Sequence, residues 1–207
     1  MKKNNKKAFS IIEVLIGIFI FSLWMVGVYA IISSTLRVND YNENYIIASN
    51  LSRWQLEMVR NIRDSNYIIL KPYNLKNPNW TSFLDSDKFE FWKKYIINND
   101  YSNTALFPIK VTELTDFWEW LSEISWKMLN YKLCLDSNNR YTYDCVTVWN
   151  KETNFYKYIS VEEVKYSSWW VVETIANSFL LKSKVIWFKK WYHEFEIKSI
   201  ITDWKRL

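Results

Sequence analysis

A long run of apolar residues near the N-terminus constrains this chain more than any other feature. From Val14 to Ile32 the sequence contains no charged residue, and the apolar block counted from Phe9 is 24 residues long. As a helix this block would extend roughly 36 Å, enough to cross a hydrocarbon core of about 30 Å. The residues before it include four lysines and no acid. We therefore expect the leader to stay cytoplasmic while the rest of the chain is exported.

Glu13 does not fit a plain membrane anchor. It lies one helical turn inside the apolar block, and a carboxylate at the centre of a bilayer costs about 2.5–3.5 kcal/mol on insertion scales. An unpaired acid inside an apolar helix predicts that a partner neutralises it in the functional state.

The segment KKAFSIIEVLIGI, which begins at Lys6, resembles the processing site of type IV prepilins and pseudopilins. In that family a peptidase cuts after a small residue, usually Gly. The new N-terminal amine, usually that of a Phe, is methylated, and the fifth mature residue is a Glu. The resemblance places the cut between Ala8 and Phe9, with Ala8 in place of the usual Gly. It also implies that Glu13 neutralises the Phe9 amine of a neighbouring subunit in a helical filament.

Two other interpretations of the apolar run compete with this one. A secretory signal peptide has an apolar core of 7–15 residues and a small-x-small cleavage site, and Val28-Tyr29-Ala30 has that pattern. The core here is longer and contains an acid. A simple signal anchor would explain the length of the run but would leave Glu13 without a role.

The ratio of tryptophan to glycine is unusual. The chain has 13 Trp and 2 Gly, whereas average usage of about 7% Gly predicts roughly 15 glycines in this length. We hypothesise that many Trp positions are glycines encoded by a reassigned UGA codon. Trp80 and Trp169-Trp170 occur in turn-like contexts that favour Gly, and Trp126 and Trp191 do so more weakly. The alternative is a Trp-rich, adhesive surface.

The sequence after Ile32 turns polar without any helix-breaking residue. From Ser33 to about Asn66 there is no Gly and no Pro. Apolar residues recur there at helical spacing, at Tyr45, Ile47, Ala48, Leu51, Met58, Val59 and Ile62. The pattern predicts one long helix over residues 9–66, with 9–32 in the membrane and an amphipathic half beyond it.

Residues 67–207 read as a β-rich globular head. The stretch 67–103 is rich in Pro, Asn, Asp and Ser, and we expect an irregular connection with a short helix at Lys88–Ile97. Six β-rich segments follow, at Leu106–Leu114, Tyr131–Leu135, Tyr141–Trp149, Tyr156–Tyr166, Val171–Leu181 and Phe195–Thr202. Their spacing predicts an antiparallel sheet that covers the apolar stripe of the helix, hence an α+β, pilin-like fold.

The head offers few residues for chemistry. Cys134 and Cys145 are its two cysteines, and a hairpin turn at Asn139-Arg140 would place them across from each other. Because an exported domain permits disulfides, we expect a disulfide; buried free thiols and a metal site are the alternatives. His193 is the sole histidine, and no G-x-S-x-G motif occurs. Two acidic clusters, at 85–87 and 136–138, could ligate calcium or be solvated turns. We predict no enzyme, no cofactor and no metal.

These observations favour a structural subunit of a type IV pilus or of a pseudopilus related to type II secretion. Its expected partners are other pilin subunits, the prepilin peptidase and the assembly platform in the bacterial cytoplasmic membrane. The head would lie outside, and the filament at the cell surface. Without the four leader lysines the net charge falls from +5 to +1, so we infer no nucleic-acid partner. The alternative function is a monomeric, membrane-anchored surface adhesin.

Overall fold

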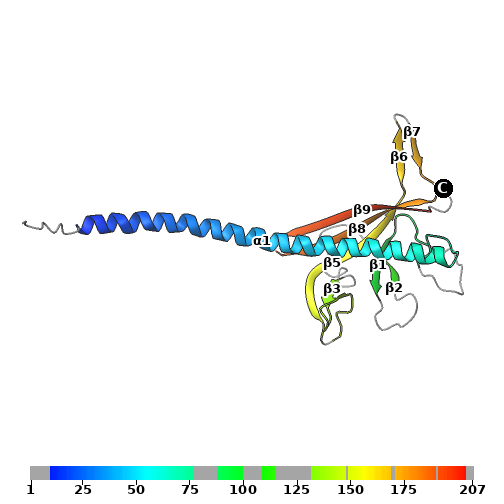
Figure 1. The fold of residues 1–207 in the computed structure, drawn as a ribbon, viewed down its shortest axis with the longest axis horizontal. Coiled ribbons are helices and arrows are strands. Elements are labelled where there is room, and N and C mark those ends of the chain that lie inside the picture. The colour runs from blue at the N-terminus through cyan, green and yellow to red at the C-terminus, as the bar shows by residue number, and fades with distance from the viewer. Residues whose placement is uncertain are drawn as a thin grey trace, which may run out of the picture. The chain divides into compact units, whose positions relative to one another are not determined.

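The computed structural model describes residues 10–76, 88–99, 109–114, 132–147, 149–168, 171–189 and 191–203. The chain divides into two compact units, residues 1–44 and 45–207, and each is described by itself. The elements are α1 (Ile11–Ile68), β1 (Lys94–Asn99), β2 (Ile109–Leu114), β3 (Lys132–Leu135), β4 (Tyr141–Thr142), β5 (Lys151–Glu162), β6 (Lys165–Ser168), β7 (Val171–Thr174), β8 (Ser178–Phe188) and β9 (Tyr192–Thr202) (Figure 1).

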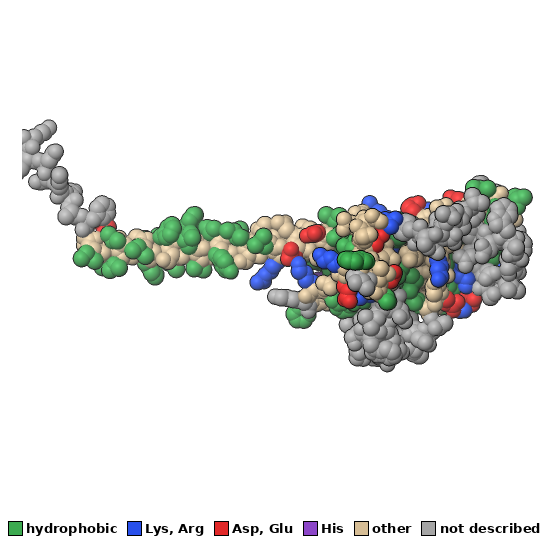
Figure 2. All heavy atoms as spheres, turned by 90° about the horizontal axis from the view of Figure 1, so that it is seen from below, with side chains coloured by type: hydrophobic (Ala, Val, Ile, Leu, Met, Phe, Trp, Pro, Cys, Tyr) green, Lys and Arg blue, Asp and Glu red, His purple; other side chains and the backbone are tan. Residues whose placement is uncertain are grey.

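The first unit consists of the N-terminal part of α1. Almost every large apolar side chain between Ile11 and Ile32 is exposed, and Figure 2 shows hydrophobic side chains along this part of the helix. Its most apolar window has a mean hydropathy of 2.5 and no residue buried inside the protein. By length and composition this helix is able to cross a membrane, as the sequence predicts.

Helix α1 ends in a hydrogen-bonded cap at Ile68, two residues beyond the predicted end. The Lys71 N–H donates to the carbonyl of Asn66 at 2.8 Å, and the Leu70 N–H donates to the carbonyl of Tyr67 at 3.1 Å. Leu70 has φ 57°. This is the Schellman arrangement, which satisfies carbonyls that the helix itself leaves unpaired.

An antiparallel sheet forms most of the second unit. The long strand β5 is its centre: β8 pairs along one edge, while β1 and β3 pair with different parts of the other edge. Strand β2 extends the sheet beyond β1, β4 beyond β3, and β9 beyond β8, which gives seven strands. Strands β6 and β7 form a separate two-stranded hairpin. One helix on an antiparallel sheet is the α+β, pilin-like architecture that the sequence predicts.

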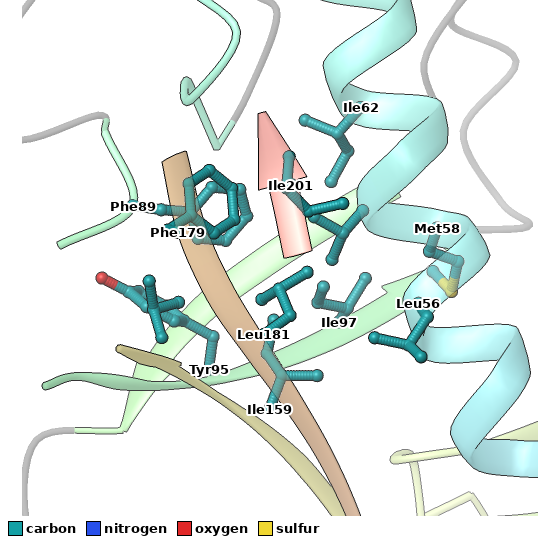
Figure 3. Packing of buried hydrophobic residues seen from close by; sticks show 12 residues of the cluster. Leu56, Met58, Ile62, Phe89, Tyr95, Ile97, Ile159, Phe179, Leu181 and Ile201 are labelled. Carbon is teal, nitrogen blue, oxygen red and sulfur yellow. The ribbon is translucent and has the colours of Figure 1, made fainter. Parts of the chain in front are cut away.

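The C-terminal part of α1 packs on this sheet through two apolar clusters. The larger cluster joins Leu56, Val59 and Ile62 of the helix to buried residues of the strands, among them Ile97, Ile159, Leu181 and Ile201 (Figure 3). The second joins helix residues Ala48 and Leu51 to Leu133, Phe155, Val185 and Trp187. Each fully buried side chain of this size contributes about 1.5–3 kcal/mol. The predicted apolar stripe of the helix is confirmed at Ala48, Leu51, Met58, Val59 and Ile62, all of which are buried.

A band of buried polar residues separates the two clusters; we call it the polar belt (Ser52, Gln55, Tyr143, Lys157 and Ser183). The hydroxyl of Ser52 lies 2.9 Å from the carbonyl oxygen of Ser183, and the hydroxyl of Ser183 donates to the Gln55 side-chain oxygen at 2.7 Å. Tyr143 donates to the backbone carbonyl of Lys157 at 3.1 Å. The Lys157 amine lies 3.6 Å from the centroid of the Trp54 ring. The belt therefore crosses the contact between helix and sheet.

The predicted short helix at Lys88–Ile97 is wrong. The structure places strand β1 at Lys94–Asn99. Tyr95 and Ile97 are fully buried in the larger cluster, whereas Ile96 belongs to a cluster with Tyr158 and Ile186. Residues that alternate between two faces follow the period of a strand.

Three predicted strands have different limits because turns interrupt them. Among the described residues of the segment Tyr141–Trp149, a strand forms only at Tyr141–Thr142. The Asp144 carboxylate accepts hydrogen bonds from the backbone N–H groups of Val146 and Thr147 and holds a turn there. The segment Tyr156–Tyr166 is divided between β5 and β6, and Val171–Leu181 between β7 and β8. The part of the expected strand at 106–108 lies outside the described residues.

Trp92 bears on the glycine hypothesis. Its φ is 67°, in the left-handed region that favours Gly, and its side chain is exposed. Trp191 is also exposed, in the turn between β8 and β9. Trp187 differs, because it is buried against Phe155. Trp80, Trp126, Trp169 and Trp170 lie outside the described residues.

We predict that Trp92→Gly raises the free energy of unfolding by about 0.5–1 kcal/mol, because the left-handed conformation costs an L-residue about 1–2 kcal/mol. Thermal unfolding followed by near-ultraviolet circular dichroism measures this. The control Trp187→Gly should lower stability by at least about 3 kcal/mol, because it empties a core position. The gene should carry TGA at Trp92 and TGG at Trp187. TGG at every Trp codon, or a destabilised Trp92→Gly, would contradict the glycine hypothesis.

The buried amine of Lys157 yields a second prediction. Desolvation lowers the pKa of Lys157 well below its usual value of 10.5. The unfolded state therefore binds this proton more tightly than the native state, which disfavours folding at neutral pH, and the penalty is lost as the pH rises toward 10.5. Lys157→Met should be more stable than the wild type at pH 7, and the difference should narrow toward pH 10. Denaturant unfolding at both pH values tests this, and a constant difference would contradict it.

Candidate functional site

The N-terminal end of α1 carries the residues that sequence analysis singles out for processing and assembly. The backbone carbonyl of Ser10 accepts hydrogen bonds from the N–H groups of Glu13, at 3.0 Å, and Val14, at 3.3 Å, so the helix begins directly after Ser10. Glu13 lies in the first turn of the helix and is exposed. Ala8 and Phe9 lie outside the described residues.

Ser10 and Glu13 have the S-x-x-E spacing of a helix capping box, which sequence analysis did not use. A negative charge in the first turn of a helix is also favoured by the helix dipole, by about 0.3–1 kcal/mol. These local effects are smaller than the cost of about 2.5–3.5 kcal/mol for a carboxylate deep in a bilayer. Within the described residues no cation forms an ion pair with Glu13.

Comparison with protein-family models identifies the prokaryotic N-terminal methylation motif at residues 3–29. This motif is the signature of type IV pilins, and the matched residues include Ala8, Phe9, Glu13 and most of the exposed apolar run. No curated protein and no solved structure matches the chain. The chain thus carries the N-terminal methylation motif of type IV pilins, and this motif is typical of structural subunits rather than of catalysts.

The two cysteines are joined in the structure. A disulfide links Cys134 to Cys145, with 5.4 Å between their Cα atoms. The expected placement is wrong in detail, because Cys134 of β3 lies opposite Thr142, and Cys145 lies three residues further, outside any strand. The disulfide therefore attaches the segment after β4 to the buried strand β3.

The turn between β3 and β4 is built around Asp136. Its carboxylate accepts hydrogen bonds from the backbone N–H groups of Asn138, at 2.8 Å, and Arg140, at 2.9 Å, and it pairs with the Arg140 guanidinium. The backbone hydrogen bond from Arg140 is the main cause that lowers the pKa of Asp136. Asn139 takes the positive φ, 58°, that this turn requires. These contacts explain the acidic cluster at 136–138 without calcium; the cluster at 85–87 lies outside the described residues.

The sole histidine and one buried lysine are two other titratable residues that lie in or near the core of the sheet. The His193 ring stacks on Trp187, with 5.3 Å between centroids, and is partly buried.

Lys157 was missed by sequence analysis. A signal existed, because β5 alternates with Phe155, Ile159 and Val161 on its buried face, and Lys157 occupies the same alternation.

We predict that the disulfide stabilises the head by about 3 kcal/mol through the unfolded state, as expected for a short loop. Non-reducing peptide mapping of exported protein should yield one peptide pair linked through Cys134 and Cys145. The double variant Cys134→Ala/Cys145→Ala should unfold at lower denaturant than the wild type, and a reducing agent should not change it further. Two thiols that react freely with an alkylating agent in the exported, non-reduced protein would contradict the prediction.

Proposed function

We propose that the protein is a subunit of a type IV pilus or of a pseudopilus. Residues 1–8 are a leader removed by the prepilin peptidase, residues 9–66 form the assembly helix with a membrane segment at 9–32, and residues 67–207 form the head. The observation that carries this proposal is the coincidence of the methylation motif with an exposed apolar helix whose one charge is Glu13.

Cleavage after Ala8 would create a cationic amine on Phe9 next to the apolar helix. A single charge buried among packed apolar helices costs several kcal/mol, whereas two opposite charges in contact offset much of that cost. The Phe9 amine and Glu13 are four positions apart, so an amine and a carboxylate from two subunits meet when one subunit is displaced along the axis. The apolar faces supply attraction without direction, and the charge pair selects one register, as a buried polar pair does in coiled coils.

The sequence of events follows from this arrangement. The precursor is inserted in the bacterial cytoplasmic membrane with the lysine-rich leader inside and the head outside. The peptidase trims and methylates it, and an assembly platform moves it from the membrane into a filament with other pilin subunits. A monomeric anchor would use the same apolar run but would gain nothing from Glu13, so the filament accounts for more of the sequence than the adhesin does.

We predict that Glu13→Ala and Glu13→Gln insert in the membrane and fold their heads but are not stably incorporated into filaments. The amide of Gln keeps the shape of the carboxylate and removes the charge that pairs with the amine. The test is to fractionate cells expressing each variant and to measure the protein in the membrane and in sheared filaments, together with loss of the leader.

Glu43→Gln is the matched control, because it makes the same change at an exposed position of α1 outside the apolar run. It should enter filaments at the wild-type level. Normal incorporation of both Glu13 variants would show that Glu13 is not the pairing group, and failure of Glu43→Gln would show that the assay reports general damage to the helix.

A further inference from the structure

One donor in the polar belt has no acceptor among the described residues. The Lys157 side chain is fully buried, and its amine has no hydrogen-bond partner there. A buried donor without an acceptor costs about 1–3 kcal/mol, and more if it is charged. Elsewhere in the belt, Ser52, Ser183 and the Gln55 oxygen bond to one another. The belt is therefore short of an acceptor, and an anion would supply one.

A surface cavity lies beside Trp54, the residue whose ring contacts the Lys157 amine. It has a volume of about 300 Å³ and is lined by Ile47, Asn50, Leu51, Trp54 and Tyr141, which come from α1 and from β4. Among the described lining residues the side chains are mainly aliphatic and aromatic, and the one amide is that of Asn50. Trp54 connects the cavity to the belt, because it lines the cavity while its ring lies 3.6 Å from the Lys157 amine.

The contact with Trp54 offsets only a part of the free-energy cost of burying a charged Lys157 amine. A cation over an indole ring gains about 2 kcal/mol when desolvated, whereas the desolvation of an unpaired ammonium ion costs several kcal/mol. The described groups that face Lys157 offer no negative charge: Trp54 and Gln55 of α1 and Val185 of β8 are neutral, and burial raises the pKa of Tyr143, with Gln55 opposing that shift. A carboxylate would supply both the hydrogen-bond acceptor and the negative charge that the Lys157 amine lacks.

We propose that this cavity binds a small apolar monocarboxylate, whose ring or chain lies among Ile47, Leu51 and Tyr141 and whose carboxylate pairs with Lys157. Lys157 does not itself line the cavity, so this pairing requires the Trp54 side chain to rotate away from the amine. The ligand brings its own counter-charge, so the amine takes up a proton on binding. This inference does not depend on filament assembly, because every residue that it uses belongs to the second compact unit, residues 45–207, and none to the apolar run.

Calorimetric titration of the full chain in nonionic detergent with sodium phenylacetate tests the proposal. We expect saturable binding near pH 8 whose heat differs between phosphate and Tris buffers, since protons taken up by the complex are released by the buffer. Phenylacetamide, the neutral analogue of the same shape, should bind at least about tenfold more weakly, because a hydrogen bond to a charged group is worth about 1.5–3 kcal/mol.

Lys157→Met removes the amine, keeps most of the aliphatic stem and should fold at least as well as the wild type. It should weaken phenylacetate binding by about 10- to 100-fold and abolish the difference between buffers. Lys198→Met makes the same change in charge at an exposed position of β9 and should leave binding unchanged. No saturable binding, equal affinity for phenylacetamide, or wild-type binding by Lys157→Met would each overturn the proposal.

Discussion

An acid inside an apolar helix is the constraint on which the N-terminal part of this protein depends. The helix must be apolar to enter a bilayer, and Glu13 makes that entry costlier. The dipole of the helix favours a negative charge in the first turn, which recovers a part of this cost within the chain. In the filament that we propose, the amine of a neighbouring subunit recovers the rest, so the membrane form is the less favourable state of Glu13 and the assembled form the more favourable one. A group of this kind favours assembly over storage in the membrane.

In the second unit, the contact between α1 and the sheet depends on apolar packing for its stability and on hydrogen bonds for its register. The two apolar clusters supply most of the attraction, which is not directional. The polar belt between them is directional, because the hydrogen bonds among Ser52, Ser183 and Gln55 form at one relative position of α1 and β8. A shift of the helix by one turn would bury these groups without partners. Lys157 is the exception, since it belongs to the belt and gains no acceptor from it.

Several turns of the head place residues other than glycine at positive φ. Four positions adopt positive φ, and they are occupied by Leu70, Trp92, Asn139 and Asn177 among the described residues. Asn tolerates this conformation through its short polar side chain, whereas Leu and Trp do not. Glycine would satisfy the geometry of both positions better, but only Trp92 could be encoded by UGA, so Trp92 alone supports the hypothesis of a reassigned codon independently of composition.

The sequence by itself determined the long helix, its apolar N-terminal run, the motif around Glu13 and the α+β class, because each depends on local periodicity or on a short pattern of residues. It also identified the face of α1 that is buried, since that face follows from helical spacing. Tertiary structure decided the rest. The segment at Lys94–Asn99 is a strand because it pairs with β2 on one side and with β5 on the other, which buries Tyr95 and Ile97 in the core. Local sequence does not encode this pairing. The limits of β4, β5 and β8 depend on turns held by side chains such as Asp144. The burial of Lys157 arises only where α1, β5 and the segment after β4 meet, since a lysine in a strand is exposed unless distant residues cover it.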